Sequence, residues 1–285
     1  MAKVDVGMAA GAAMVRVAAR VAPQRTARWV ARRFLTTRRR PSRPEEERVL
    51  ARAERWTLHD EGRALPVYAW GEGEVVLLAH GWNGSAAQLT PFVEPLTARG
   101  FRVVAFDAPA HGGAPGRLTH VPEMARVLAR LAAETGARLV VGHSAGAAAA
   151  ALAARRGLAL DRAVVIAAPP RFDVWARRFG EALGLPDARM APFLEELEVL
   201  GGCPLADLSL RSNVPSLRGP VLAIFDETDR LVDVGEARAA LAGAPGVVWH
   251  ETSGLGHGRI VADPAVVQRV AGFLEEASFL AALAA

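Results

Sequence analysis

The sequence predicts an α/β fold in which helices cover both faces of a mostly parallel sheet. Short, continuous apolar runs alternate along the 285 residues with stretches of helical character, and strands buried on both faces of a sheet have this unbroken apolar pattern. The helical stretches end at glycines, and one strand–turn–helix passage contains a Gly-x-Ser-x-Gly pentapeptide. Strands that alternate with helices are joined by right-handed crossovers, so ligands are expected at the carboxyl ends of the strands.

Six apolar runs are expected to form the parallel strands. They are Val75 to Ala79, Val103 to Phe106, Leu139 to Val141, Ala163 to Ala167, Val221 to Phe225 and Val247 to Trp249. Helices are expected between them at Ala86 to Arg99, Val121 to Thr135 and Ala147 to Ala154, each with a glycine stop close behind it. The loosely alternating pattern of Glu54 to Trp70, which Asp60-Glu61-Gly62 interrupts, predicts a preceding β-hairpin.

The N-terminal 43 residues differ from the rest of the chain in charge. They carry eleven of the 34 Lys and Arg residues but only one of the 30 Asp and Glu residues, which predicts a basic amphipathic leader followed by a Pro-rich linker. Packing on the domain or partial disorder is favoured over contact with an anionic membrane surface, and Asp5 argues against a targeting peptide. Nucleic-acid binding is not predicted, because interleaved aromatic residues and a recognisable binding module are missing. If the leader is separate from the catalytic domain, deletion of residues 1–43 is expected to leave esterase activity largely unchanged.

The interval from Pro169 to Gly219 breaks the alternation of strands and helices. It has no strand pattern, whereas Phe172 to Leu185 and Ala191 to Leu200 carry apolar residues at helical spacing. We therefore expect a helical insertion over the sheet edge, a candidate lid, whose aromatic and leucine stripes serve its own packing in preference to a binding-site wall. The predicted domains are a leader at 1–43, a core at 44–170 and 220–285, and a cap at 171–219.

Two features bear on where the protein resides. The chain has no run of about 18 uncharged apolar residues, so no membrane-spanning helix is expected. Its single cysteine, Cys203, cannot form an internal disulfide, which suits a reducing compartment. A cytoplasmic protein is predicted, with peripheral membrane contact through the leader as the alternative.

Ser144 stands at the turn of the strand–turn–helix passage and is the candidate nucleophile. A serine at so sharp a turn adopts a strained conformation, and Gly142 and Gly146 are expected where strand and helix crowd each other. The strain exposes the hydroxyl above the sheet. The backbone N–H of Ala145, at the start of the helix, is available to negative charge.

A serine hydroxyl needs a base, and the base works best when an acid orients it. His257 is the candidate base, because its glycine-rich loop follows the last predicted strand. Asp226 and Asp229 both follow the strand before it, and either can serve as the acid. We prefer Asp229 and interpret Asp226 as a turn former, with Asp233, while His59, His120 and His250 are interpreted as structural.

The developing oxyanion needs two backbone donors. The N–H groups of Ala145 and Trp82 are assigned to this role, since Trp82 lies in the glycine-containing loop after the first long buried strand. The Trp82 indole is equally compatible with lining an acyl pocket and with packing. The neighbouring residues His80, Gly81 and His143 are assigned to substrate binding, with His80 also bracing the loop, and no metal site is predicted.

Together these motifs resemble the α/β-hydrolase fold superfamily over Glu54 to about Leu274. The matching stretches are His80-Gly81-Trp82, Asp107-Ala108-Pro109-Ala110-His111-Gly112, Gly142-His143-Ser144-Ala145-Gly146, the Asp229 loop and Gly256-His257. The resemblance implies an eight-stranded, mostly parallel sheet, a helical cap after the sixth strand, and a Ser-Asp-His triad that needs no cofactor. Two positions depart from the common pattern: Ala110 replaces the usual glycine, and Ala114 a frequent serine.

A serine nucleophile argues against dehalogenase and epoxide-opening chemistry, in which a carboxylate forms the intermediate. Hydrolysis of a small-molecule carboxylic ester through an acyl-enzyme on Ser144 is therefore predicted. A thioesterase or an acyltransferase would use the same triad. A noncatalytic binding protein remains the alternative from another class, because fold does not decide function.

Overall fold

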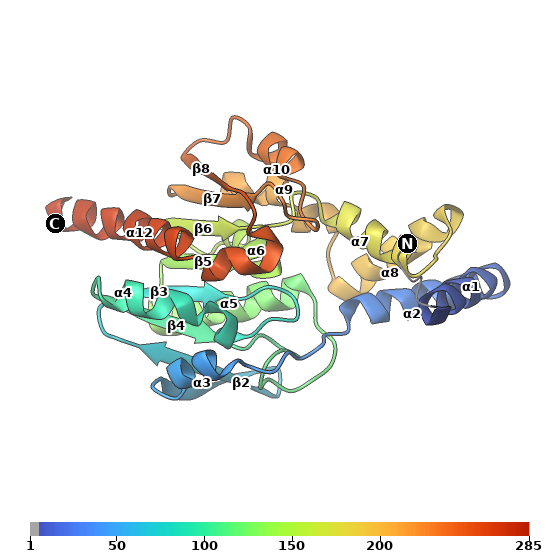
Figure 1. The fold of residues 1–285 in the computed structure, drawn as a ribbon, viewed down its shortest axis with the longest axis horizontal. Helices are drawn as coiled ribbons and strands as arrows, with labels where there is room; N and C mark the ends of the chain where they lie inside the picture. The colour runs from blue at the N-terminus through green and yellow to red at the C-terminus, as the bar shows by residue number, and fades with distance from the viewer. Residues whose placement is uncertain (1–5, 285) are drawn as a thin grey trace.

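A computed structural model describes residues 6–284 of the chain. Eight strands form one sheet in the order β1-β2-β4-β3-β5-β6-β7-β8, which runs through the middle of the molecule (Figure 1). β1 pairs antiparallel with β2 and β2 with β4, whereas every other pairing is parallel. The strands are β1 Glu54–Asp60, β2 Arg63–Trp70, β3 Glu74–Ala79, β4 Phe101–Phe106, β5 Leu139–His143, β6 Arg162–Ile166, β7 Val221–Asp226 and β8 Val247–Thr252. The predicted fold class is confirmed.

Helices cover both faces of this sheet. Successive strand residues alternate between two apolar cores: Leu77 packs with α5 and α6, whereas its neighbour Val76 packs with α4 and α12. The helices of the sheet domain are α3 Pro44–Leu50, α4 Val93–Thr97, α5 Val121–Thr135, α6 Ala145–Arg155, α10 Val234–Leu241, α11 Gly256–Arg259 and α12 Pro264–Ala284. Parallel pairing brings the loops after β5, β7 and β8 to one edge.

The helix expected at Ala86 to Arg99 is shorter and partly of another type. A 3₁₀ helix runs over Ala86–Phe92 and is followed by the five-residue α4. Pro91 lies inside the 3₁₀ segment, and a proline within a helix removes a backbone donor and clashes with the carbonyl group four residues earlier. A continuous α-helix is therefore excluded here.

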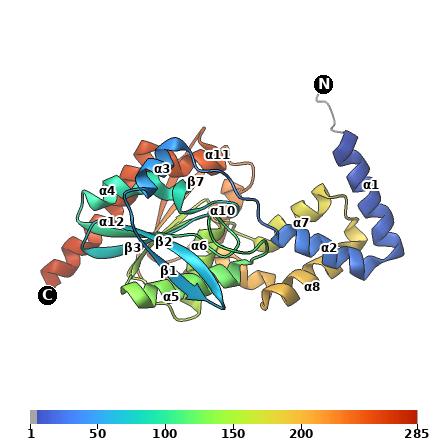
Figure 2. The same cartoon turned by 90° about the horizontal axis from the view of Figure 1, so that it is seen from below.

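Four further helices gather beyond one end of the sheet (Figures 1 and 2). They are α1 Val6–Val21, α2 Pro23–Leu35, α7 Phe172–Ala182 and α8 Met190–Gly201. The last two belong to the insertion between β6 and β7, which continues through α9 Leu210–Asn213. None of the helices within residues 6–284 is long and apolar enough to cross a membrane.

The basic leader is not separate from this body. Val30, Phe34 and Leu35 of α2 are buried in the same core cluster as the sheet, and Arg28 pairs with Glu196 of α8 at 2.9 Å. Beyond α2 the chain forms a β-bridge between Thr36 and Leu118. Of the alternatives for the leader, packing on the domain is the one that α2 adopts. Asp5, the residue that argues against a targeting peptide, lies outside the described residues.

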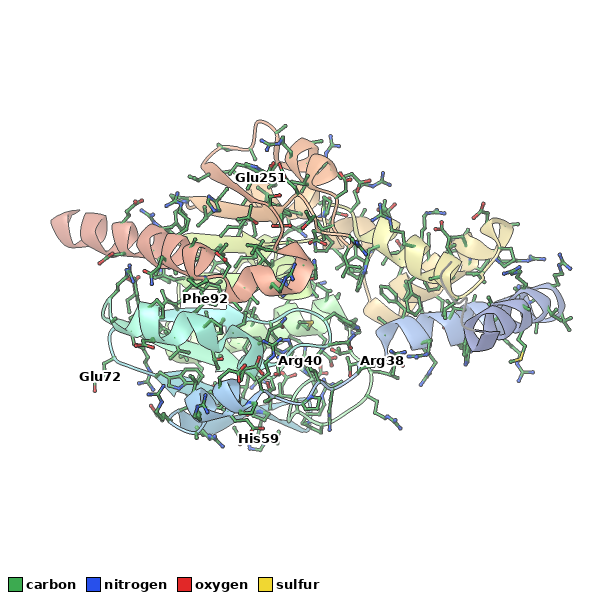
Figure 3. All side chains as sticks on the ribbon, in the orientation of Figure 1. Arg38, Arg40, His59, Glu72, Phe92 and Glu251 are labelled. Atoms are coloured by element: carbon green, nitrogen blue, oxygen red, sulfur yellow. The ribbon has the colours of Figure 1, made fainter. Side chains whose placement is uncertain are left out.

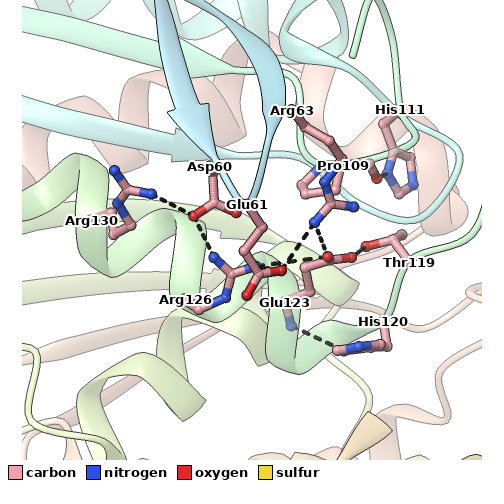
Figure 4. A network of polar contacts seen from close by, with 10 residues as sticks. All are labelled: Asp60, Glu61, Arg63, Pro109, His111, Thr119, His120, Glu123, Arg126 and Arg130. Carbon is pink, nitrogen blue, oxygen red and sulfur yellow. Dashed lines mark hydrogen bonds and ion pairs between the residues drawn. The ribbon is translucent and has the colours of Figure 1, made fainter. Parts of the chain in front are cut away.

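Polar contacts attach the β1–β2 hairpin to α5 (Figure 4). The buried Asp60 pairs with Arg126 and with Arg130, the latter at 2.7 Å. His120 caps the start of α5, because its Nδ1 accepts the N–H of Glu123 at 3.1 Å. The ion pairs of Asp60 hold the hairpin to α5. The helix α5 lies on the face of the sheet opposite to α12.

Candidate active site

Ser144 lies between β5 and α6 with φ 52° and ψ −118°, in the left-handed half of backbone space that side chains rarely adopt. The flanking glycines are required by close contacts. A Cβ on Gly142 would lie 2.5 Å from the Ala147 Cα, and one on Gly146 would lie 2.2 Å from the Ala79 carbonyl oxygen. The close backbone contacts leave room only for glycine at positions 142 and 146. The strained turn between them lifts the Ser144 side chain above the sheet edge.

A chain of hydrogen bonds joins the three predicted catalytic residues. The Ser144 hydroxyl donates to the His257 Nε2 at 3.0 Å, and the His257 Nδ1–H donates to the Asp229 Oδ2 at 2.7 Å. Ser144 follows β5, Asp229 follows β7 and His257 lies in α11, after β8. The structure brings these residues together from positions far apart in the sequence.

Asp229 is held as a carboxylate oriented toward His257. Its Oδ1 accepts the backbone N–H groups of Leu231 at 2.8 Å and Val232 at 3.1 Å, which leaves Oδ2 for the imidazole. Burial of the side chain raises the pKa, but the hydrogen bond and the charge interaction with His257, together with the two backbone hydrogen bonds, outweigh it, so the Asp229 pKa lies below its usual value. An ionised carboxylate at this point stabilises a protonated His257.

Asp226 has a different task from Asp229. Its Oδ1 accepts from the Thr228 N–H, the Thr228 hydroxyl and the Gly256 N–H, all within 2.9 Å. Its Oδ2 accepts from the Thr252 hydroxyl at 2.8 Å and the Leu255 N–H at 3.0 Å. Burial opposes ionisation, but these donors hold the Asp226 pKa well below its usual range. Asp226 therefore ties the loop after β7 to the loop that carries His257.

The two expected oxyanion donors lie beside the serine. Trp82, Ala145, Ser144 and His257 line one cavity of about 130 Å³. Ala145 is the first residue of α6, and the first N–H groups of a helix have no partner within it. The other walls of the cavity are apolar apart from Asn83; they come from Pro169, Phe172, Trp175, Leu231 and Val232.

The three residues assigned to substrate binding lie behind this cavity and do not line it. His80 is buried; its Nδ1–H donates to the Gly81 carbonyl at 2.8 Å, and its Nε2 accepts the Ala108 N–H at 3.0 Å. The His143 Nε2–H donates to the His257 carbonyl at 2.9 Å, and burial lowers the His143 pKa to about 3. A Cβ on Gly81 would lie 2.8 Å from the His143 Nδ1. All three support the site from beneath.

Aromatic side chains from three parts of the chain form one wall. The Phe34 ring lies 6.4 Å from the Trp82 ring, 4.8 Å from Trp175 and 5.1 Å from Phe179. The Trp82 indole therefore packs against Phe34 and also lines the cavity, so both interpretations of this side chain apply. The cap stripe likewise serves both purposes, because Phe172 and Trp175 line the cavity while packing against Phe34.

Sequence reasoning missed the contribution of the leader to this site. The backbone N–H of Arg38 donates to the Asn83 Oδ1 at 2.6 Å, and the Thr37 hydroxyl donates to the Ala110 carbonyl at 2.6 Å. Asn83 adopts φ 60°, so this side-chain contact supports a strained turn beside Trp82. Phe34 and the polar residues after it carry no local motif, and only their positions in space reveal the role.

The loop after β4 contains the two departures from the common pattern. Ala110 adopts φ 66°, a conformation that favours glycine, which accounts for the usual residue there. Asp107 holds the loop, since its Oδ1 accepts the Ala86 N–H at 2.9 Å and its Oδ2 the Gly113 N–H at 2.8 Å. The carbonyl oxygen of the buried Ala114 accepts a hydrogen bond from the Arg39 guanidinium at 2.6 Å.

Comparison with known proteins identifies the family. The Alpha/beta hydrolase family matches residues 76–270, so the chain belongs to that family. No curated protein sequence matches it significantly. Within the described part of the chain, no cluster of three or more His, Cys, Asp or Glu side chains is arranged to hold a metal ion.

Solved structures with different reactions share the fold. A Pyrococcus furiosus esterase aligns with a TM-score of 0.62 at 20% identity, over 84% of this chain and 98% of the esterase. The thioesterase domain from the curacin biosynthetic pathway gives 0.56 at 19%, over 78% and 98%. A Vigna radiata epoxide hydrolase gives 0.58 at 16%, over 80% and 99%. Similarity at these identities establishes the fold alone.

Proposed function

We propose that the protein is a serine hydrolase that cleaves a carboxylic ester through an acyl-enzyme on Ser144. The observation that carries the proposal is the Ser144–His257–Asp229 hydrogen-bond chain, with distances of 3.0 and 2.7 Å. An apolar cavity beside the hydroxyl suits an acyl group, and the family membership supports a hydrolase.

Each residue has one task in the proposed reaction. His257 takes the Ser144 proton while Oγ attacks the ester carbonyl, and the N–H groups of Ala145 and Trp82 stabilise the oxyanion. His257 then gives the proton to the leaving alcohol as the C–O bond breaks. In the second half His257 takes a proton from water, the hydroxide attacks the acyl carbonyl, and the proton returns to Ser144 as the acid leaves. Asp229 stays ionised throughout.

A thioesterase or an acyltransferase is the alternative, because the same groups act on a thioester or pass the acyl group to an alcohol. The absence of an aspartate at position 144 favours these reactions over the epoxide opening of one structural neighbour. Product partition in the presence of an added alcohol separates transfer from hydrolysis.

Labelling with a fluorophosphonate and turnover of a short-chain aryl ester test the proposal. The intact protein is expected to label and to turn over, whereas Ser144→Ala loses both, with kcat reduced on the order of 10⁶-fold. Ser212→Ala on α9, whose side chain is exposed, is the matched control and keeps both. Labelling or turnover that survives in Ser144→Ala would reject the assigned nucleophile, and folded protein that neither labels nor turns over would favour a binding protein.

We keep the prediction of a cytoplasmic protein and limit the proposed membrane contact to α1. Met14, Val17 and Val21 are exposed on that helix near Arg16 and Arg20. Exposed apolar side chains with neighbouring arginines are typical of helices that lie on anionic membrane surfaces. The apolar side chains Val30, Phe34 and Leu35 of α2, by contrast, are buried in the protein and are not available to a membrane.

A further inference from the structure

A second cavity adjoins the serine cavity. It has a volume of about 310 Å³ and lies between α2 and α7. Trp82, Asn83 and Trp175 line both cavities. The two indoles therefore form a shared wall, and the second cavity lies on the other side of these side chains from Ser144.

The lining of the second cavity combines apolar and cationic groups. Phe34, Phe179 and Leu183 supply apolar surface, and the lining also includes two cationic residues, Arg33 and Arg38. Arg33 is half-buried and Arg38 exposed; Figure 3 places Arg38 at the passage from α2 to the sheet domain. Other arginines nearby are already paired, as Arg28 is with Glu196 and Arg40 with Glu46. Neither Arg33 nor Arg38 has an acidic partner in the described part of the chain.

Arg33 and Arg38 have no carboxylate partner among the described residues to neutralise them, so their guanidinium groups are available to bind an anion. Arginine binds phosphate and carboxylate oxygens through paired N–H donors, and such charge-assisted bonds are about twice as strong as neutral ones. The apolar part of the lining, from Phe34, Phe179 and Leu183, offers contact to the part of a ligand that adjoins the anion. Charge and shape together point to an amphiphilic ligand with one anionic end.

We propose that the second cavity binds a phosphate or carboxylate group of the substrate, remote from the scissile carbonyl, through Arg33 and Arg38. The inference rests on the proposed function and narrows its substrate to anionic esters or thioesters. Binding of the anion is coupled to the site, because the Arg38 backbone also holds Asn83 next to Trp82. The leader therefore supplies specificity to a core that contains all the reacting groups.

Matched aryl esters test this inference. A neutral ester is compared with analogues that carry a carboxylate or a phosphate, either at the end of the acyl chain or on the leaving group. We expect KM for one of these charged series to lie at least about tenfold below that of the neutral ester, and raised salt to narrow the difference. The four charged analogues, with carboxylate or phosphate on the acyl chain or on the leaving group, show which anion is preferred and on which half of the substrate it lies.

Arg33→Gln, Arg38→Gln and the double variant are expected to remove the preference by raising KM for the charged ester to that of the neutral ester. The ratio of the two KM values is the readout, and both Arg38 variants keep the backbone N–H that Asn83 accepts. Arg25→Gln, on α2 but outside the cavity, is the matched control. Inorganic phosphate is expected to inhibit hydrolysis of the charged ester competitively, and the double variant is expected to lose this inhibition. Equal KM for charged and neutral esters, or a preference that survives in the double variant, overturns the inference. Loss of all hydrolysis together with loss of fluorophosphonate labelling in the intact protein would instead reject the proposed function.

Discussion

The edge of the sheet and the wall between α2 and the cap are built by different forces. At the edge, Asp226 alone accepts five hydrogen bonds and ties together two loops, and the Ser144–His257–Asp229 chain depends on that connection. At the wall, Phe34 contacts Trp82, Trp175 and Phe179 through ring packing alone. The atoms proposed to react are held by directional bonds, whereas the cavity proposed for the substrate is shaped by apolar contact.

The difference has consequences for function. Hydrogen bonds to a charged group depend steeply on geometry, so they define the positions of the nucleophile and base closely. Ring packing tolerates changes of shape, since apolar contact is nondirectional. Changes at the edge are therefore expected to act on kcat, and changes at the wall on stability and on substrate preference.

Among the changes that compare the edge with the wall, the largest effect is expected at Asp229. Asp229→Asn is expected to lower kcat about 10⁴-fold, because the amide no longer stabilises the protonated His257, while the remaining oxygen still accepts the N–H groups of Leu231 and Val232. Steady-state kinetics and thermal unfolding measure the two quantities.

Asp226→Asn is the isosteric counterpart. Both Asp226 oxygens accept backbone N–H groups, so an amide nitrogen in either place faces a donor. We expect a loss of stability of about 1–3 kcal/mol and a much smaller loss of kcat than in Asp229→Asn. The reverse order of effects would show that Asp226 is the acid.

An intermediate effect is expected at the wall. Phe34 is 4% exposed and packs against the cap and Trp82, so Phe34→Ala is expected to lower the free energy of unfolding by about 3–5 kcal/mol. Loss of support for Trp82 should also reduce kcat/KM on the order of tenfold. Denaturant unfolding and ester kinetics check both values.

Trp29→Ala provides the control on the same helix. The Trp29 side chain is 52% exposed, so its removal is expected to change stability by only about 0.5 kcal/mol. If Phe34→Ala behaves like Trp29→Ala, α2 is the dispensable leader that the sequence predicted. The burial of Phe34 leads us to expect the opposite, and removal of residues 1–43 should therefore impair the enzyme.

The last prediction concerns the pH dependence of stability, to which the buried His111 and His143 contribute. Burial lowers the pKa of His111 and of His143 from 6.5 to about 3. Below pH 6.5 the unfolded chain takes up protons that these folded side chains do not, so stability is lost as pH falls from about 6.5 toward 3. Each histidine is expected to contribute up to about 1.4 kcal/mol per pH unit.

Urea unfolding between pH 7 and pH 5 measures this slope. His143→Gln keeps a donor for the His257 carbonyl and is expected to reduce the slope by the share of one histidine. His59→Gln serves as the comparison, because His59 is exposed on β1 and its replacement should leave the slope unchanged. An unaltered slope in His143→Gln would show that His143 takes up its proton without unfolding.

The strands and the three residues proposed for catalysis were predictable because local signals mark them. Apolar runs identify buried strands, and Gly142 and Gly146 mark a turn that no other residue fits. The order of Ser144, Asp229 and His257 follows from the order of the strands in the sheet. The limits of the first helix were less predictable, since Pro91 permits a 3₁₀ helix that the apolar spacing does not reveal.

The sequence by itself determined the sheet and the turn that carries Ser144 at its edge, because the backbone constraints of glycine and the burial of strands are properties of short segments. Only the tertiary structure decided which aspartate contacts His257, that His80 and His143 lie beneath the cavity, and that Phe34 and Arg38 lie beside it. These are contacts between residues 28 to 114 positions apart, and packing between such distant side chains leaves no periodic pattern in the sequence.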